Sequence, residues 1–266
     1  MTFSLALAGV LFLASPPLTA ADKLDLVQRA LDAWEHVQLT ALRLTATVSR
    51  GEARLSLRCE LRADEQLESV ILAFPVPAGG PFEGDVTAAC DGQPLGRLAP
   101  VSTHRPPGRS GSRSAAGPPW LEGLGLGELN SCFDAFLGAS TAVQCEFLWH
   151  LYETNFMDKA ARVVQVEARV PPRALTDCDH GPCYAFVLPL RLGRFYAGPA
   201  GKLEAAVTLA DDLQPEDVLW TRPPGVKREG RKFTFTADDA VPLEDLVLVV
   251  KGKPPAAPMP KQEAGK

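Results

Sequence analysis

The sequence predicts an all-β protein, an antiparallel β-sandwich with a short amino-terminal helix and one or two short inserted helices. Many segments alternate apolar with polar residues, which is the pattern of strands that bury one face. The 24 prolines and 22 glycines, against 7% aromatic residues, favour a loop-rich β protein over a helical bundle. The 266 residues suffice for one large domain or two small ones. We expect a single domain over residues 22–252, because neither half offers a self-sufficient set of strands.

Residues 1–21 have the pattern of a secretory signal peptide. The apolar run "FSLALAGVLFLA" has the length of a signal and is too short to span a bilayer, and "SPPLTAAD" supplies small residues for cleavage after Ala21. No Lys or Arg precedes the run, and the alternative is a buried first strand or helix. We therefore expect an exported protein, periplasmic or extracellular, whose mature chain has no transmembrane segment.

The next segment, residues 22–37, predicts a short amphipathic helix. Its apolar residues recur at steps of three or four and form one stripe, with charged residues on the opposite side. The polar side mixes acidic and basic residues, which favours a helix packed on the sheet over one lying on a membrane surface.

From residue 39 the period of the pattern changes to two. Residues 39–49 and 53–62 alternate on either side of "RGE", which predicts a β-hairpin. Residues 67–77 predict a strand that ends in prolines, which cannot continue a ladder. Residues 84–98 predict a second hairpin, with its turn at "DG".

The middle of the chain contains a segment that can bury very little. Residues 102–119 ("STHRPPGRSGSRSAAGPP") contain no large apolar residue, so they can bury little surface, and they predict a flexible surface loop. Residues 127–138 have helical spacing and end in a glycine, which predicts a short inserted helix.

The tail, residues 253–266, is rich in Pro, Lys and Ala and is expected to be disordered. The remaining strands are expected within residues 142–156, 162–170, 184–192, 202–209, 231–237 and 243–252.

The order of three short motifs resembles a family of bacterial exported proteins that carry a domain of unknown function. The family's FPLP-like, vDGxP-like and WxGPIG-like motifs correspond here to "AFPVP" (73–77), "CDGQP" (90–94) and "YAGPAG" (196–201). This chain departs from the pattern at Tyr196, where the family has tryptophan, and at Ala200, where it has isoleucine. The resemblance implies an exported β-sandwich and supplies no activity.

The six cysteines of an exported chain predict disulfide bonds. Fifteen pairings are open in principle, and the sequence spacing favours three local ones. These are Cys59–Cys90, Cys132–Cys145 and Cys178–Cys183.

The stretch "TDCDHGPC" (176–183) could hold a metal, a redox pair or a structural disulfide. A zinc site would recruit Cys178, His180 and Cys183, but a second ligand cluster is missing from the sequence. A thioredoxin-type pair has C-x-x-C spacing at a helix start, whereas this spacing is C-x4-C. The structural disulfide is our interpretation, and we assign no metal ligand.

The sequence patterns that accompany catalysis are missing. There is no G-x-S-x-G, no H-E-x-x-H and no phosphate-binding P-loop, so we assign no catalytic residue and expect no cofactor. Asp211 and Asp238 lie at the ends of predicted strands. We interpret them as residues that form turns or cap a following helix, and favour this role over catalysis. Tyr152 and His150 share one side of a strand and form the candidate binding surface that the sequence offers.

These patterns predict a non-catalytic exported binding or structural module of the bacterial cell envelope. The formal net charge of −5 argues against a nucleic-acid partner, and the expected partner is an envelope protein or a glycan. The alternative is an envelope hydrolase acting on glycan or ester bonds, built on acids such as Asp211 and Asp238.

Overall fold

The computed structural model describes residues 34–77, 85–102, 147–175, 181–190, 192, 196–240 and 245–253. Within these ranges the chain is built of β-strands, as the sequence predicts, together with a short 3-10 helix, η2 (Pro215–Asp217). No helix in this part of the chain is long and apolar enough to cross a membrane. Several expected segments lie outside the described residues and remain predictions: the signal segment, most of the amino-terminal helix (22–33), the loop at 103–119, the helix at 127–138 and the tail from 254.

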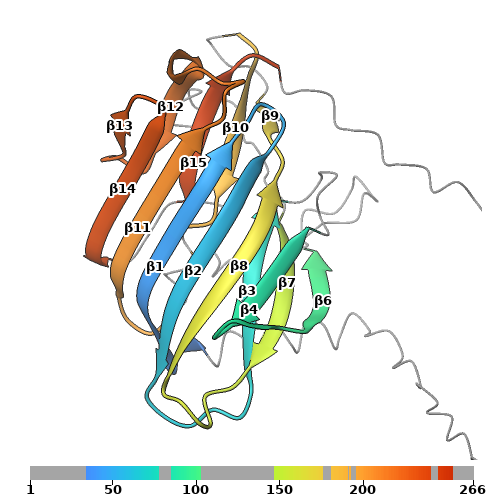
Figure 1. Ribbon diagram of the computed structural model, residues 1–266, viewed down its shortest axis with the longest axis vertical. Helices are drawn as coiled ribbons and strands as arrows, with labels where there is room; N and C mark the ends of the chain where they lie inside the picture. Colours follow the sequence, from blue (N-terminus) through green and yellow to red (C-terminus); the bar gives the residue numbers. More distant parts are fainter. Residues whose placement is uncertain are drawn as a thin grey trace, which may run out of the picture.

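One layer of the sandwich is an eight-stranded sheet with the order β13-β14-β11-β1-β2-β8-β4-β5, which faces the viewer in Figure 1. Its strands are β1 (Val37–Val48), β2 (Ala53–Ala63), β4 (Val86–Cys90), β5 (Gln93–Pro94), β8 (Ala161–Val170), β11 (Ala200–Leu209), β13 (Lys227–Glu229) and β14 (Lys232–Ala240).

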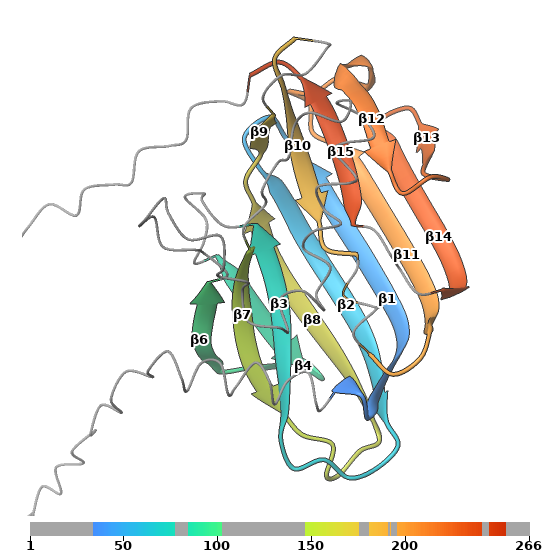
Figure 2. The same cartoon turned by 180° about the vertical axis from the view of Figure 1, so that it is seen from behind.

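Two smaller sheets form the other layer and lie in front of the eight-stranded sheet in Figure 2. The four-stranded sheet has the order β12 (Val218–Arg222), β15 (Leu246–Lys251), β10 (Cys183–Leu188) and β9 (Arg173–Leu175). The three-stranded sheet has the order β3 (Val70–Pro77), β7 (Phe147–Thr154) and β6 (Arg97–Ser102). The strands β6, β9, β12 and β13 are short or irregular, and the alternation of the sequence did not predict them.

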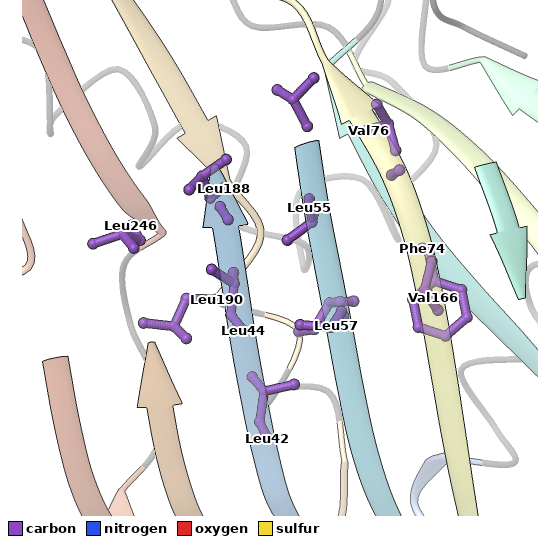
Figure 3. Close-up of a cluster of buried hydrophobic side chains, with 14 of the residues drawn as sticks. Leu42, Leu44, Leu55, Leu57, Phe74, Val76, Val166, Leu188, Leu190 and Leu246 are labelled. Carbon is purple, nitrogen blue, oxygen red and sulfur yellow. The ribbon is translucent and has the colours of Figure 1, made fainter. Parts of the chain in front are cut away.

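The period of two decides which side chains enter the core. On β1, Leu42 and Leu44 are buried, whereas the alternate residues Arg43 and Thr45 are exposed. Strands β10 and β15 are buried at almost every position, so side chains on both faces of these two strands are shielded from solvent. Figure 3 shows leucines of β1 and β2 pointing toward Leu188, Leu190 and Leu246 across the interior. The described strands thus share one hydrophobic core between the two layers.

Both hairpins that the sequence predicts are present. β1 pairs with β2 in antiparallel register from Val37↔Ala63 to Val48↔Ala53. The second hairpin joins β4 to β5 through Asp91 and Gly92, whose φ angles of 49° and 81° are left-handed. Asp and Gly are among the residues that tolerate this conformation best, which explains why "DG" turns here.

One strand pair departs from the antiparallel expectation. β1 and β11 run parallel, from Ala41↔Lys202 to Val48↔Leu209, whereas the other described pairs are antiparallel. At the start of this pair, a Cβ on Gly201 would lie 2.5 Å from the backbone oxygen of Thr40. The glycine therefore permits the close approach of the two strands, which brings the amino-terminal and carboxy-terminal parts of the chain into one sheet.

Candidate binding site

The candidate surface at His150 and Tyr152 is buried, so that prediction is wrong. The two residues are 0% and 1% exposed. The Tyr152 hydroxyl donates a hydrogen bond to the backbone oxygen of Val86 at 3.0 Å, and Val86 begins β4 of the large sheet. This side of β7 therefore faces the large sheet, and the alternation of the sequence could not indicate which side of the strand would be covered.

His150 remains chemically unusual, because neither ring nitrogen has a hydrogen-bond partner among the residues that the structure describes. Burial lowers the pKa of its imidazole to about 4, and the positive charge of Arg97 adds to this effect.

The predicted Cys59–Cys90 disulfide is absent, and both residues are buried free thiols. Each lies opposite Val164 of β8, on opposite sides of that strand. Two strand spacings place their Cα atoms about 10 Å apart, beyond the roughly 7 Å that a disulfide can bridge. Burial also raises the pKa of the Cys59 thiol to about 12, which suppresses its reactivity.

Cys183, by contrast, is disulfide-bonded. Its sulfur is therefore not a thiolate ligand, which removes it from the zinc interpretation of "TDCDHGPC". Cys132, Cys145, Cys178 and His180 lie outside the described residues, so the pairings Cys178–Cys183 and Cys132–Cys145 stay predictions.

The acids considered for hydrolysis do not form a pair. Asp238 lies opposite Lys202 near the start of β11, whereas Asp211 follows the end of that strand and forms an ion pair with Arg231 at 3.6 Å. The seven residue-to-residue steps from position 202 to position 209 span about 23 Å. Paired catalytic carboxylates of glycosidases lie about 5–9.5 Å apart, so these two cannot act together. No group of three or more potential metal ligands occurs in the part of the chain that the structure describes.

The solvent face of the eight-stranded sheet carries two adjoining depressions, both shallow and widely open to solvent, of about 480 Å³ and 290 Å³. They share Arg54, Leu55 and Glu167 and run across β4, β8, β2, β1 and β11. We call the two depressions the transverse groove. The outward side chains that line it are those of Thr45, Thr47, Arg54, Ser56, Asp85, Thr87, Glu167, Arg169, Ala206 and Thr208.

Short side chains make the floor of the transverse groove. Ala206, Thr45 and Ser56 are register partners on neighbouring strands, and Ser56 lies opposite Glu167 of β8. The Ser56 hydroxyl donates to Glu167 Oε1 at 2.7 Å. The hydroxyls of Thr45, Thr47, Thr87 and Thr208 make no side-chain hydrogen bond within the described ranges. These hydroxyls are therefore free to bind a ligand.

Two arginines that line the groove, Arg54 and Arg169, are held by Glu52. The Nε atoms of Arg54 and Arg169 each donate to a Glu52 oxygen at 2.7 Å, and Arg169 also donates to Asp85 at 2.9 Å. Burial raises the pKa of the Glu52 carboxyl, but the hydrogen bonds from the two arginines outweigh burial and keep the pKa below its usual value. Glu52 therefore stays ionised and fixes the position of both guanidinium groups.

Arg54 differs from Arg169 in how much of its side chain is available. Its side chain is 73% exposed, and the bond from Nε to Glu52 leaves its terminal nitrogens without a partner in the described residues. The guanidinium therefore presents donors toward the groove while its stem is held in place.

Sequence reasoning missed this site. The outward positions of each strand could be read from the alternation, including the Thr-rich side of β1. The groove, however, combines β1 and β2 with β8 and β11, which lie more than 100 residues later in the sequence. The register between distant strands has no local sequence signal, so the residues could not be brought together.

Comparison with known proteins gives no family. No family model and no curated protein matches the sequence. Among solved structures, the chain is similar to an M1 zinc metallopeptidase from Deinococcus radiodurans, with a TM-score of 0.32 and 10% identity over 81% of this chain and 42% of that chain. It is also similar to yeast LTA4 hydrolase, with a TM-score of 0.40 and 10% identity over 82% of this chain and 29% of that chain. The chain spans less than half the length of these proteins, and a likeness this low assigns neither a family nor an activity.

Proposed function

We propose that the chain is an exported, non-catalytic binding module of the cell envelope that holds its ligand in the transverse groove. The proposal of export is supported by the signal-like pattern of residues 1–21. The proposal of binding is supported by the groove, whose uncommitted hydroxyls and fixed guanidinium lie on a sheet that packs against a second layer. Binding residues on such strands are held rigidly, which lowers the entropy lost on binding.

The observation that carries this proposal is the set of free polar groups on one rigid face. Thr45, Thr47 and Thr208 present hydroxyls from two adjacent strands, and Arg54 presents its terminal nitrogens beside them. In the free protein these exposed groups are hydrated, and a ligand that replaces this water can hydrogen-bond to them directly. The distance between Asp211 and Asp238 gives no support to hydrolysis by these acids.

The proposal is tested by filling the groove. The mature protein with Thr45→Tyr should lose binding to isolated cell-envelope material by roughly tenfold or more, because the larger ring covers the floor and its hydrogen-bonding groups. The matched control is Thr236→Tyr, which places the same ring on the exposed face of β14 outside the groove. Co-sedimentation with envelope fractions measures the binding, and the unfolding midpoint of each variant reports its stability.

The proposal is supported if the Thr45→Tyr protein loses binding while the Thr236→Tyr protein keeps it. Equal binding by both variants and the unmodified protein would place the binding surface elsewhere, and no binding by any of the three would overturn the assignment as a binding module.

A further inference from the structure

We propose that residues 22–33 form an amphipathic helix that packs across the outer side of the three-stranded sheet, the side that faces away from the eight-stranded sheet. Three observations support this docking. The outer side is buried, the segment ends at a tryptophan anchored on β3, and the apolar stripe of the segment runs in line with that tryptophan.

The outer side of the three-stranded sheet is covered, although it points away from the core between the two layers. Tyr152 of β7 and its register partner Leu72 of β3 point toward the eight-stranded sheet, because the Tyr152 hydroxyl bonds to Val86 of β4. Successive side chains of a strand alternate, so Ile71 and Leu151 point the other way. They are nevertheless 2% and 0% exposed. Another part of the protein therefore packs over them.

The shape of the covered area suits a single helix. The four-stranded sheet lies beside the three-stranded sheet in the same layer and not over it (Figures 1 and 2). Glu153, which lies directly opposite Ile71 on the same side, is exposed, so the covered area is narrow. An α-helix with its side chains is about 10 Å wide, which is enough to cover two neighbouring strands.

The amino-terminal segment ends at this sheet. Trp34, the first described residue, has a helical backbone, and a turn at residues 35–36 connects it to β1. Its indole Nε1 donates to the backbone oxygen of Ile71 on β3 at 3.0 Å, and its ring stacks on Tyr196 at 5.3 Å. The residue is 1% exposed. A helix that ends at Trp34 therefore ends against the edge strand of the three-stranded sheet.

The apolar stripe of the segment is in line with Trp34. Leu24, Val27 and Leu31 precede the tryptophan at steps of three and four, which places all four residues on one side of a helix. Because Trp34 is fixed on β3, this side turns toward the sheet, and the charged residues of the opposite side face water. A helix of the twelve residues 22–33 is about 18 Å long, close to the roughly 23 Å of the eight-residue strand β7.

This docking leaves the transverse groove open. The groove lies on the solvent face of the eight-stranded sheet, whereas the helix would lie on the opposite surface of the sandwich. The segment that follows the predicted cleavage site would thus be held away from the surface proposed to bind a ligand. The docking itself does not depend on that proposed function.

The first test measures backbone amide exchange in the unmodified mature protein. Amides of residues 27–33 should exchange with deuterium roughly tenfold or more slowly than those of an unstructured peptide of the same sequence, because a docked helix keeps them hydrogen-bonded. Exchange at the rate of the unstructured peptide would overturn the proposal, since an isolated helix of this length is marginal in water.

A matched pair of substitutions identifies the docked side. Leu31→Asp places a charge within the apolar stripe, whereas Leu26→Asp makes the same change on a side of the helix that the stripe does not occupy. Hydroxyl-radical footprinting, read by mass spectrometry, measures the exposure of Ile71 and Leu151, which are buried in the unmodified protein. Oxidation of both residues should rise severalfold in the Leu31→Asp protein and stay unchanged in the Leu26→Asp protein.

The remaining outcomes are decisive against the proposal. Unchanged oxidation of Ile71 and Leu151 in both variants would show that another segment covers this side, and an equal rise in both would show that the stripe is not the docked side. If Leu31→Asp abolishes cooperative unfolding, Leu31→Ala and Leu26→Ala give the same comparison with milder changes. Envelope binding by the Thr45→Tyr protein is a separate measurement, so failure of the docking leaves the proposed function standing.

Discussion

At the residue scale, His150 is a buried polar side chain. Its imidazole is fully buried, neither ring nitrogen has a hydrogen-bond partner within the described ranges, and Arg97 lies near enough to disfavour a second positive charge. Desolvation disfavours the charged form of a buried base, so the neutral form dominates in the folded protein over the physiological range. Protonation of this group should therefore weaken the fold in mild acid.

The expected consequence is a loss of stability between about pH 7.5 and about pH 5. The pKa of His150 is about 4 in the folded state against 6.5 ordinarily, so the unfolded chain binds the proton first as the pH falls. Stability is fully present above about pH 6.5 and is lost as the pH falls toward 4. At about pH 5 the loss amounts to about 2 kcal/mol. Urea unfolding measures the free energy at both pH values.

His150→Leu should remove this component of the pH dependence. His36→Leu is the control, because the His36 side chain is 57% exposed and pairs with Glu65 at the surface. If the His150→Leu protein lost as much stability between the two pH values as the unmodified protein does, the buried imidazole would not be the responsible group.

At the scale of the elements, the parallel pair of β1 and β11 depends on Gly201. The side of β11 that carries this glycine approaches the backbone of Thr40, next to an irregularity of β1 between Leu39 and Ala41. The "YAGPAG" motif therefore has a steric reason for its last glycine. The hairpins were predictable because a turn and its two strands are adjacent in sequence. The β1–β11 pair was not, since more than 150 residues separate its strands.

Gly201→Ala is expected to destabilise the protein by about 1–3 kcal/mol, the usual range for a side chain forced into a packed site. The added Cβ would lie 2.5 Å from the Thr40 backbone oxygen, so the two strands would have to move apart. Gly96→Ala provides the control, because a Cβ there meets no atom within 4 Å. Chemical unfolding of the two variants measures the difference, and equal stabilities would show that the close approach is not required.

At the scale of the whole molecule, the large sheet interleaves distant parts of the chain. β11 and β14 lie beside β1, while β8 lies between β2 and β4. The four-stranded sheet consists of strands that begin at residue 173 or later, and it covers part of the same core. Removing the carboxy-terminal strands would therefore expose the edge of β1 and the core face of β1 and β2.

A shortened chain that ends at residue 199 should consequently fail to fold. It lacks β11–β15, so it loses the β11 partner of β1 and two strands, β12 and β15, of the four-stranded sheet. A chain that ends at residue 253 retains all described strands and is expected to unfold cooperatively like the full-length protein. Circular dichroism and thermal unfolding compare the two. Cooperative unfolding of the shorter chain would instead favour two tandem β domains.

The sequence by itself determined the fold class, both local hairpins and the inward or outward side of many residues. These follow from a period of two and from turn residues, which act between neighbours in the chain. The predicted exposure of His150 and Tyr152 was wrong because it depends on which sheet covers the strand. The predicted Cys59–Cys90 disulfide was wrong because it depends on which strands are adjacent. Tertiary structure alone decided the β1–β11 pair and the transverse groove. The physical reason is that the backbone hydrogen bonds joining strands are nearly the same for every residue type, so the order and register of distant strands emerge only when the whole core is packed.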